Sequence, residues 1–350
     1  MAKCVFIVQG EGRGHLSQAI ALKEYLDEAG MSLEAVFVGK KEADQLPDYF
    51  VDCFGDNILP FHSPYFLRTP NRKGIYVGRT LLFNLLRSFR YIRELRRIRR
   101  TINSLNPEVV FNFYDVVGAL ALRNLKPGIK RIGIGHHFYL HFKDYFGLKG
   151  QVDRYLLAWH TRIIMNSCDR VLALSHVEQE GTSQLEIVPP LIRKSYREMR
   201  YRAGKRYLAY FLLEGYLYDL IRLAREDPAF QADVYTEIVP GIELPPGIRM
   251  GQIDGENFRD RMASCKGLIS TAGFDTIAEA AYHGIPQVVI PARNHFEQRC
   301  NSMDMEACGL GISIDQITPD LQKELKYVDP SEYRKWADRS GELILKTMLE

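Results

Sequence analysis

The sequence predicts an α/β fold of two domains, each built on a doubly wound parallel sheet. Short apolar runs alternate with helical patterns along the chain, and the runs are continuously apolar, as in strands that are buried on both faces. The alternation pauses once, at the prolines of residues 189–190. The 350 residues, 46% of them hydrophobic, suffice for two cores. Two such domains would face each other across a cleft between the carboxyl edges of their sheets.

The first half begins with a strand at residues 3–9, KCVFIVQ. A glycine-rich loop and a helical pattern follow, and Gly30 ends that helix. Further strands are expected at residues 33–38, 109–113, 131–135 and 170–173. The arginine-rich residues 193–206, which include few apolar side chains, are interpreted as a linker into the second half.

The second half starts with an apolar strand at residues 207–212. Strands in VYTEIV, IRMGQI, KGLIS and PQVVI follow, separated by helical patterns. The last periodic segment, Pro330–Leu349, is expected to form a helix. We therefore expect Rossmann-like domains at residues 1–190 and 191–330, with a C-terminal helix at residues 331–350.

Charge and cysteine content exclude several kinds of protein. The net charge of +3 is too small to indicate a nucleic-acid partner, so any basic site must be local. The six cysteines show no C-x-x-C spacing, which predicts reduced and mostly buried thiols in a cytoplasmic protein. The N-terminal apolar run is too short for a signal peptide, and no apolar stretch reaches the roughly 18 residues of a membrane span.

The segment 267–311 places an anion site and polar recognition groups in one βαβ unit. A short strand leads into Thr271, Ala272 and Gly273, and a helix follows from about Phe274. The backbone N–H groups and the positive end of the helix dipole near Gly273 would stabilise a pyrophosphate without a dedicated lysine.

More polar side chains lie at the same carboxyl edge, where open α/β sheets bind ligands. Glu279 is about two turns along the helix, so its carboxylate is expected to reach ribose hydroxyls, by analogy with the acid of dinucleotide sites. After the next strand comes the loop with Asn294, His295, Glu297 and Gln298. The segment therefore predicts a site for a nucleotide diphosphate.

The loop GEGRGHLSQ, residues 10–18, is the second motif. Its glycines lack the G-x-G-x-x-G spacing and the second strand ends at Gly39 rather than at an acid, which argues against NAD. The glycines would let the backbone approach a ligand and would place His15 at a helix start. An imidazole suits removal of a proton from a hydroxyl at neutral pH, so His15 is the candidate base. The alternative is a histidine that faces solvent or loop carbonyls.

The order TAGF, HGIPQVVIP, EQ and Asn301 resembles the donor-binding signature of GT-B glycosyltransferases. That family includes UDP-glucuronosyltransferase-like enzymes, plant secondary-metabolite glucosyltransferases and the GlcNAc transferase of peptidoglycan synthesis. The loop GxGRGH is similar to the family's first loop, although Gln18 stands where the family has a proline. The resemblance implies the GT-B fold, with a C-terminal tail that crosses back to the first domain.

The resemblance also implies a UDP-sugar donor and roles for five residues. Thr271 and Gly273 would face the diphosphate, and Glu279 the ribose. Glu297 and Gln298 would contact the sugar hydroxyls. Thr271 replaces the histidine of the plant signature, so the phosphate contact there would be weaker or made by the backbone.

In the plant enzymes an aspartate after a first-domain strand orients the base histidine. Asp115 occupies the comparable place after VVFNFY. A carboxylate can hold an imidazole in one tautomer. The alternative is that Asp115 is the N-cap of the helix VVGALALR, an ordinary role for aspartate.

Two histidines follow the strand RIGIG and lie at the same carboxyl edge. With the glycine loop they form the expected acceptor or phosphate side, which comprises Gly12, Arg13, Gly14, His136 and His137. A metal site at the two histidines is a weaker alternative, because no flanking carboxylate motif accompanies them. The sequence contains no Asp-x-Asp, which favours stabilisation of a leaving UDP by amides and a helix dipole, without a metal or cofactor.

The segment Arg79–Arg100 combines a leucine cluster with seven arginines from Arg87 onward. Tyr91, Leu95, Ile98 and Ile102 share one helical face, opposite an arginine face. The candidates for contact with an anionic membrane are Leu82, Leu86, Arg93, Arg97 and Arg100. The alternatives are a core helix with a solvated arginine face and, with little support, a nucleic-acid site.

The motifs together predict an inverting, metal-independent glycosyltransferase that moves a sugar from a UDP-sugar to a hydroxyl acceptor. A lipid-linked or cell-envelope glycan acceptor is compatible with them. A UDP-GlcNAc 2-epimerase-like enzyme and a non-catalytic relative that binds sugar nucleotides or membranes are the alternatives. The expected location is cytoplasmic, either free or peripheral on the inner face of the membrane.

Overall fold

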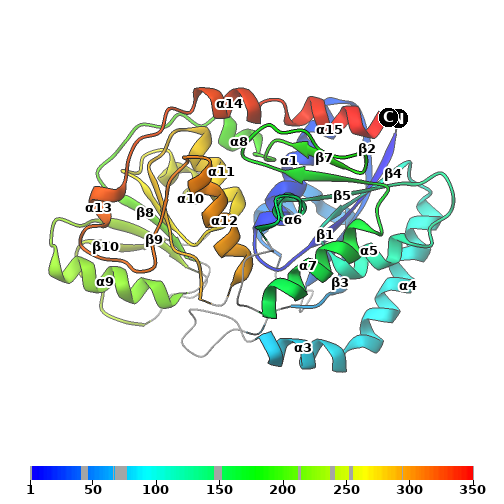
Figure 1. Cartoon of the computed structure of the whole chain (residues 1–350), viewed down its shortest axis with the longest axis horizontal. Coiled ribbons are helices and arrows are strands. Elements are labelled where there is room, and N and C mark those ends of the chain that lie inside the picture. The colour runs from blue at the N-terminus through cyan, green and yellow to red at the C-terminus, as the bar shows by residue number, and fades with distance from the viewer. Residues whose placement is uncertain are drawn as a thin grey trace. The chain divides into compact units, whose positions relative to one another are not determined.

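The computed structural model describes residues 2–40, 46–65, 67, 77–145, 152–211, 214–236, 241–251, 255–293 and 295–349. The chain divides into two compact units (Figure 1). Unit 1 comprises the described residues of Met1–Leu67, Val77–Arg193 and Trp336–Glu350, and unit 2 those of Lys194–Lys335. Each unit contains a parallel sheet flanked by helices, which confirms the predicted fold class.

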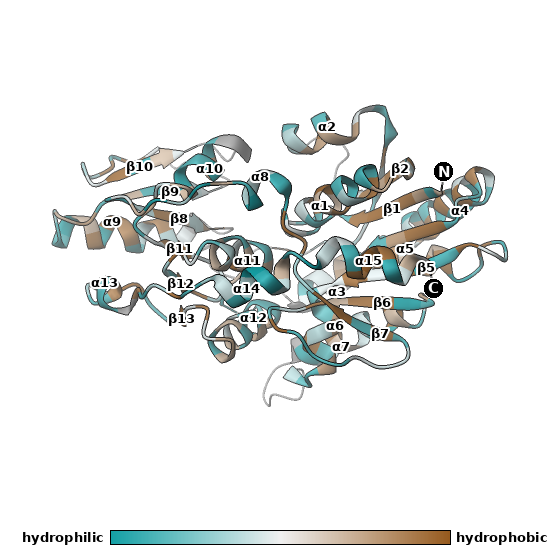
Figure 2. Cartoon of the chain, turned by 90° about the horizontal axis from the view of Figure 1, so that it is seen from above, coloured by the Kyte–Doolittle hydropathy of each residue, from teal (hydrophilic) through white to brown (hydrophobic). Residues whose placement is uncertain are grey.

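The sheet of unit 1 has the strand order β3-β2-β1-β4-β5-β6-β7 in the described part of the chain. Its strands are β1 (Lys3–Gln9), β2 (Ser32–Lys40), β3 (Ile58–His62), β4 (Val109–Phe113), β5 (Lys130–Gly135), β6 (Arg170–Leu174) and β7 (Leu185–Val188). Phe6 of β1 lies opposite Val36 on one side and Phe111 on the other. The central strand β1 is buried from Cys4 to Val8, because both of its faces are covered. Its residues are accordingly apolar, and the strand is brown in Figure 2.

Helices cover this sheet in two groups. The described helices of unit 1 are α1 (Gly14–Glu28), α2 (Asp48–Phe54), α3 (Val77–Leu86), α4 (Ser88–Leu105), α5 (Val116–Leu122), α6 (His136–Phe142), α7 (Val152–Met165) and α15 (Ser340–Leu349), with a short 3-10 turn η1 (Gly55–Asn57). The helix α1 packs against α2 and α15, whereas α5 packs against α4 and α7. Ile98 and Ile102 of α4 are fully buried in the core, as their shared helical face predicts.

The sheet of unit 2 has the strand order β10-β9-β8-β11-β12-β13 in the described residues. Its strands are β8 (Tyr207–Phe211), β9 (Ala232–Thr236), β10 (Ile248–Gly251), β11 (Leu268–Ser270), β12 (Gln287–Val289) and β13 (Ile312–Ser313). Its helices are α8 (Lys194–Arg197), α9 (Leu217–Glu226), α10 (Gly255–Met262), α11 (Phe274–Tyr282), α12 (Phe296–Ala307) and α13 (Leu321–Glu324), with a 3-10 turn η3 (Glu214–Tyr216). Apolar side chains of β8, β9 and α9 form most of the core, including Phe211, Val234 and Leu220.

The sequence did not predict the strands β3, β7 and β13. Each is at an edge of its sheet and short, between 2 and 5 residues. Edge strands have one unpaired side and fewer buried side chains, so their apolar runs are weak signals. Pro60 lies within β3, where an edge position tolerates the missing N–H.

Two segments that were each expected to be one helix are broken. The helix α3 ends at Leu86 and α4 begins at Ser88. The C-terminal segment forms α14 (Ser331–Ala337) and α15, separated by a turn. Residues on the two sides of this turn bind different parts of unit 1. Before the turn, Trp336 Nε1 donates to Ser175 O at 2.9 Å, and after it Ser340 Oγ donates to Pro190 O at 2.8 Å.

Both sheets contain a point where the strand order reverses. In unit 1 the chain builds outward from β1 to β2 and β3, and then from β4 to β7 on the other side. In unit 2 the reversal falls between β8 and β11. Helices that leave neighbouring strands in opposite directions leave the carboxyl ends of those strands uncovered, which is where doubly wound sheets bind ligands.

Candidate functional site

The glycine loop of unit 1 lies at the carboxyl end of β1, at the reversal point. The loop approaches β2 so closely that a Cβ on Gly10 would lie 2.2 Å from Gly39 O, and Gly12 has φ +81°. Neither position accommodates another residue without strain. The loop leads into α1, which begins at Gly14 and carries His15 as its second residue.

The imidazole of His15 is half-buried and forms a hydrogen bond with Gln18, a partner that the sequence did not indicate. Its Nδ1 lies 3.2 Å from Gln18 Oε1, one turn along α1. Because a carboxamide oxygen accepts, Nδ1 carries the hydrogen and the lone pair lies on Nε2. The ring also stacks over Tyr114, with centroids 5.9 Å apart and planes at 22°.

Asp115 is fully buried at the start of α5 and acts as its N-cap. Its Oδ1 accepts from Gly118 N at 2.7 Å, and its Oδ2 accepts from Ser63 Oγ at 2.5 Å. Burial raises the pKa of this carboxyl to about 6, although the hydrogen bonds from Gly118 and Ser63 oppose the shift. The capping role is therefore observed, and orientation of His15 by Asp115 stays a prediction.

Tyr114 contacts both His15 and His137 at this edge of the sheet, and the sequence analysis did not predict a role for it. Its φ of 60° is in the left-handed region, which costs on the order of 1 kcal/mol for a residue with a Cβ. Its hydroxyl lies 2.5 Å from Thr161 Oγ1, and its ring stacks on His137 with centroids 3.7 Å apart and planes at 13°. The stack brings His137 beside His15, with ring centroids 5.7 Å apart.

The other residues of the predicted acceptor side are placed differently. His136 points toward β6, because its Nδ1 lies 2.8 Å from Leu174 O and its ring neighbours His176 at 5.8 Å. Arg13 is the residue before α1, and its guanidinium lies 6.0 Å from the centroid of the Tyr49 ring. Arg193 approaches the same ring at 5.4 Å, which adds a second cation near the glycine loop.

In unit 2 the loop Thr271–Gly273 lies at the reversal point, directly after β11. Thr271 N donates to Tyr210 O at 3.2 Å, and Gly273 N donates to Thr271 O at 2.6 Å. The N–H of Gly273 is thus used inside the loop, so the N–H groups of the helix N-terminus belong to the first turn of α11, from Phe274. Gly273 has φ −85°, and a Cβ there would have no atom nearer than 3.9 Å. The fold itself does not require this glycine.

Most of the predicted donor-side residues in this loop, α11 and α12 are buried. Thr271, Ala272, Phe274 and Glu279 are buried, with Glu279 6% exposed on α11. Gln298 is buried near the start of α12, where its Oε1 accepts from Ala292 N at 2.8 Å and its Nε2 remains as a donor.

The other predicted donor-side residues, Glu297 and Asn294, belong to the start of α12 and to the segment just before it. Glu297 is half-buried in the first turn of α12. Its helix is N-capped by His295, whose Nδ1 accepts from Gln298 N at 3.4 Å. Asn294 lies outside the described residues.

Two buried polar atoms beside the loop were not assigned from the sequence. Asn301 Nδ2 donates to Ala272 O at 3.0 Å, which fixes the loop from α12. Asn301 Oδ1 and Ser270 Oγ are buried and have no hydrogen-bond partner among the described residues. A buried polar atom without a partner is costly, so these two atoms have hydrogen-bonding capacity that the described residues do not use.

The comparisons with known proteins decide the family. The model of glycosyl transferase family 1 matches residues 2–328. The chain belongs to this family. A comparison with curated protein sequences gave no match.

Solved structures show that this glycosyltransferase has the GT-B fold. The glycotransferase of kitacinnamycin is 15% identical with a TM-score of 0.64, covering 99% of this chain and 98% of that chain. MurG of Acinetobacter baumannii is 13% identical with a TM-score of 0.57, covering 100% and 99%. A UDP-glucosyltransferase from Polygonum tinctorium is 13% identical with a TM-score of 0.59, covering 99% and 92%. The predicted resemblance is confirmed.

Exposed apolar side chains gather on α3 and the start of α4 of this glycosyltransferase. The exposed fractions are 60% for Leu82, 69% for Leu85, 75% for Leu86, 85% for Phe89 and 45% for Ile92. Arg93, Arg97 and Arg100 are exposed on α4, and Arg97 also donates to Pro60 O and pairs with Glu94. We call this surface the α3–α4 patch.

Three further features of the described residues bear on earlier expectations. No described helix is both long and apolar enough to cross a bilayer. No described cluster of three or more His, Cys, Asp or Glu side chains has a metal-binding arrangement. All six cysteines are free, and burial raises the pKa of the Cys4 and Cys168 thiols to about 12.

We expect Asp115→Asn to stabilise the protein at about pH 7 by on the order of 2 kcal/mol. The folded-state pKa of about 6 exceeds the ordinary 3.8, so the contribution of the protonated carboxyl to stability is complete below about pH 4 and is lost as the pH rises through 6. Asn keeps the cap acceptor for Gly118 and carries no charge. Urea unfolding from about pH 4 to 7 measures this, and parallel curves for both proteins would contradict it.

We expect Gly273→Ala to change the free energy of unfolding by less than about 1 kcal/mol, since a Cβ fits at the native φ. A methyl group at the loop would nevertheless obstruct the close approach of a diphosphate to α11. Affinity for UDP, measured by calorimetry, should fall at least about tenfold. Equal affinity of both proteins would show that no anion approaches the loop here.

Proposed function

We propose that this glycosyltransferase transfers a sugar from a UDP-sugar to a hydroxyl acceptor, with inversion and without a metal ion. One observation carries the proposal. The carboxyl end of β11, at the reversal point of unit 2, combines a tight backbone loop, a helix N-terminus and the buried carboxylate of Glu279. Such a combination suits a nucleotide diphosphate, because backbone N–H groups and the helix dipole stabilise phosphate charge.

In the proposed reaction His15 removes the proton of the acceptor hydroxyl. The hydrogen bond to Gln18 places the lone pair on Nε2, which is the nitrogen that receives this proton. The acceptor oxygen then forms a bond to the anomeric carbon, while the bond from that carbon to the UDP oxygen breaks. UDP leaves with the electron pair, and the start of α11 stabilises its added charge.

Three side chains of α11 and α12 would hold the donor, each through a different group of it. Glu279 would accept hydrogen bonds from ribose hydroxyls, as the resemblance implies. Gln298 would donate to a sugar hydroxyl through Nε2, because its Oε1 is already held by Ala292 N. Glu297 would accept from a neighbouring sugar hydroxyl. The UDP-glucosyltransferase name of the Polygonum tinctorium relative supports uridine as the base.

The α3–α4 patch supports an acceptor at an anionic membrane. Leucine and phenylalanine side chains with exposed fractions up to 85% are costly in water, and arginines on the same helices complement lipid phosphates. We include in the proposal that the patch docks on anionic lipid and that the acceptor is lipid-linked.

We expect His15→Ala to lower kcat by roughly 10²- to 10⁴-fold while the affinity for UDP is unchanged, since the imidazole acts on the acceptor. Normal turnover in the His15 variant would remove the base assignment.

We expect Glu279→Gln to weaken UDP binding about tenfold without unfolding the protein, because the amide keeps the size of the side chain. The control is Glu226→Gln, which changes an exposed glutamate at the end of α9.

We expect the double variant Leu86→Ser with Phe89→Ser to lose most of its co-sedimentation with vesicles that contain anionic phospholipid. Unfolding temperature should be unchanged, because these side chains are 75% and 85% exposed. The matched control is Val51→Ser with Tyr218→Ser, which are 43% and 51% exposed elsewhere on the chain. Equal vesicle binding by the three proteins would show that the patch has another partner.

A further inference from the structure

Unit 2 has a groove at the end of its sheet opposite the Thr271–Gly273 loop. Lys266 precedes β11 and Pro286 precedes β12, so both lie at the amino ends of these parallel strands. The groove has a volume of about 660 Å³. We call it the amino-edge groove, and its polar lining is Arg200, Tyr201, Lys266, His283, Tyr327 and Arg334.

The cations of the amino-edge groove form no ion pair with described carboxylates. Hydrogen bonds from Ser331 lower the pKa of Asp329, and Arg334 lies near enough for its charge to lower this pKa further. Arg200 makes no hydrogen bond or ion pair with any described residue and is exposed. Lys266 Nζ donates to Gln322 Oε1 at 3.3 Å and lies over the Tyr207 ring at 4.7 Å. Arg334 Nε donates to Tyr282 O at 2.5 Å, and its Nη2 lies 3.5 Å from His283 Nδ1. None of these partners carries negative charge.

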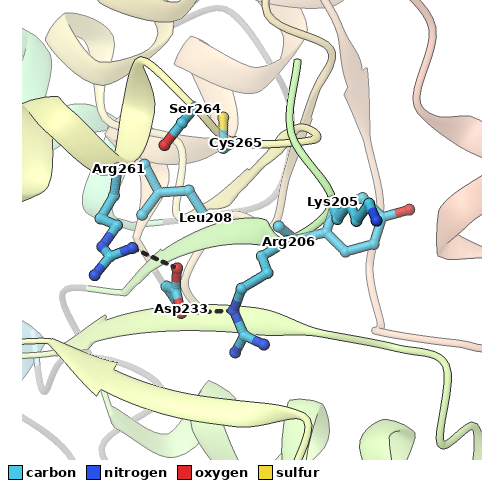
Figure 3. A pocket seen from close by; sticks show the side chains of 8 residues that line it. Lys205, Arg206, Leu208, Asp233, Arg261, Ser264 and Cys265 are labelled. Atoms are coloured by element: carbon cyan, nitrogen blue, oxygen red, sulfur yellow. Dashed lines mark hydrogen bonds and ion pairs between the residues drawn. The ribbon is translucent and has the colours of Figure 1, made fainter. Parts of the chain in front are cut away.

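The neighbouring surface adds positive charge rather than removing it. A second hollow, of about 240 Å³, is lined by Arg206, Asp233 and Arg261. In it Arg206 and Arg261 both face Asp233 (Figure 3). The distances are 2.8 Å from Arg206 Nε to Asp233 Oδ1 and 3.9 Å from Arg261 Nη1 to Asp233 Oδ2. Asp233 is therefore satisfied within its own hollow. Lys205, beside it, has no hydrogen-bond or ionic partner among the described residues.

The carbonyl end of α11 would repel an anion if it were bare. The helix ends at Tyr282, next to the groove, and a helix C-terminus carries partial negative charge. Arg334 covers this end by its bond to Tyr282 O. The Nη1 group of Arg334 has no hydrogen-bond partner among the described residues, so it remains available to a ligand.

We propose that the amino-edge groove binds a free small molecule with two or more linked phosphate groups. Its volume is typical of a small-molecule pocket. Cations from three separate chain segments converge on it, which suits several negative charges on one ligand better than a single carboxylate. Among the described residues that line the groove, Tyr327 alone is a large hydrophobic residue with a high exposed fraction, 65%, and the other apolar lining residues are Met199, Ala203, Pro286 and Pro330. The groove therefore lacks the exposed leucine and phenylalanine side chains that suit insertion into a membrane.

The test is calorimetric titration with sodium pyrophosphate of the wild-type chain and of the Gly273→Ala variant, which obstructs the proposed donor loop and leaves the lining of the amino-edge groove unchanged. We expect one pyrophosphate site that the Gly273 variant retains, with affinity that falls as salt rises. In that variant, adding Arg200→Ala with Lys266→Ala should weaken pyrophosphate binding at least about tenfold. The matched control is Lys323→Ala with Lys335→Ala, which removes two exposed cations that are paired with Asp320 and Glu332.

Each outcome decides between explanations. The proposal is overturned if the wild-type protein binds no pyrophosphate under these conditions, or if the Arg200 and Lys266 variant binds it as tightly as the control. Binding of phosphatidic acid vesicles without binding of pyrophosphate would also overturn it, in favour of a lipid headgroup. If the double variant unfolds at a lower temperature, the single variants Arg200→Gln and Lys266→Gln replace it. Equal UDP affinity of the wild-type protein and the Gly273→Ala variant would remove the proposed donor site alone, because the pyrophosphate site is tested by the Arg200 and Lys266 substitutions.

Discussion

The reversal of strand order in each parallel sheet is the constraint on which the candidate site depends. Helices leave β1 and β4, and likewise β8 and β11, on opposite sides, so the carboxyl ends of these strands are open. His15 follows β1, Tyr114 and Asp115 follow β4, and the Thr271–Gly273 loop follows β11. Within each unit, residues that are far apart in sequence thus lie at the sheet edge where the backbone leaves room for a ligand.

The backbone packs closely around Asp115, and the residue before it, Tyr114, has a left-handed backbone conformation. A Cβ on Gly39 would lie 2.6 Å from Asp115 Oδ2, so β2 and the start of α5 are held in direct contact. The carboxylate must cap α5 from this confined position, and the preceding residue, Tyr114, turns into the left-handed region to allow it. The same turn directs the Tyr114 ring toward His15 and His137. A local helix cap and the arrangement of the imidazoles are therefore one structural unit.

The sequence predicted what depends on local pattern and missed what depends on contacts between distant segments. Strands such as β1 and the buried stripe of α4 are visible as periodic apolar residues. Gln18 stands where the family pattern has a proline, and this substitution does not by itself reveal the hydrogen bond to His15 one helical turn away. The stack of Tyr114 on His137 joins the ends of β4 and β5, so it required the register of the sheet. His136 and His137 are adjacent and identical, and only the fold shows that they point in different directions.

The net charge of the chain is only +3, yet positively charged or N–H donor groups are concentrated at both ends of α11. The candidate donor loop lies before its first residue, and the amino-edge groove lies beside its last turn. Nine residues span about 13 Å at the helical rise, which exceeds the Debye length of about 8 Å at physiological ionic strength. Charge at one end is therefore largely screened from solvent-exposed charge at the other. The two proposed anion sites on this helix would therefore bind independently, the first through backbone N–H groups and the second through the side chains of arginine and lysine.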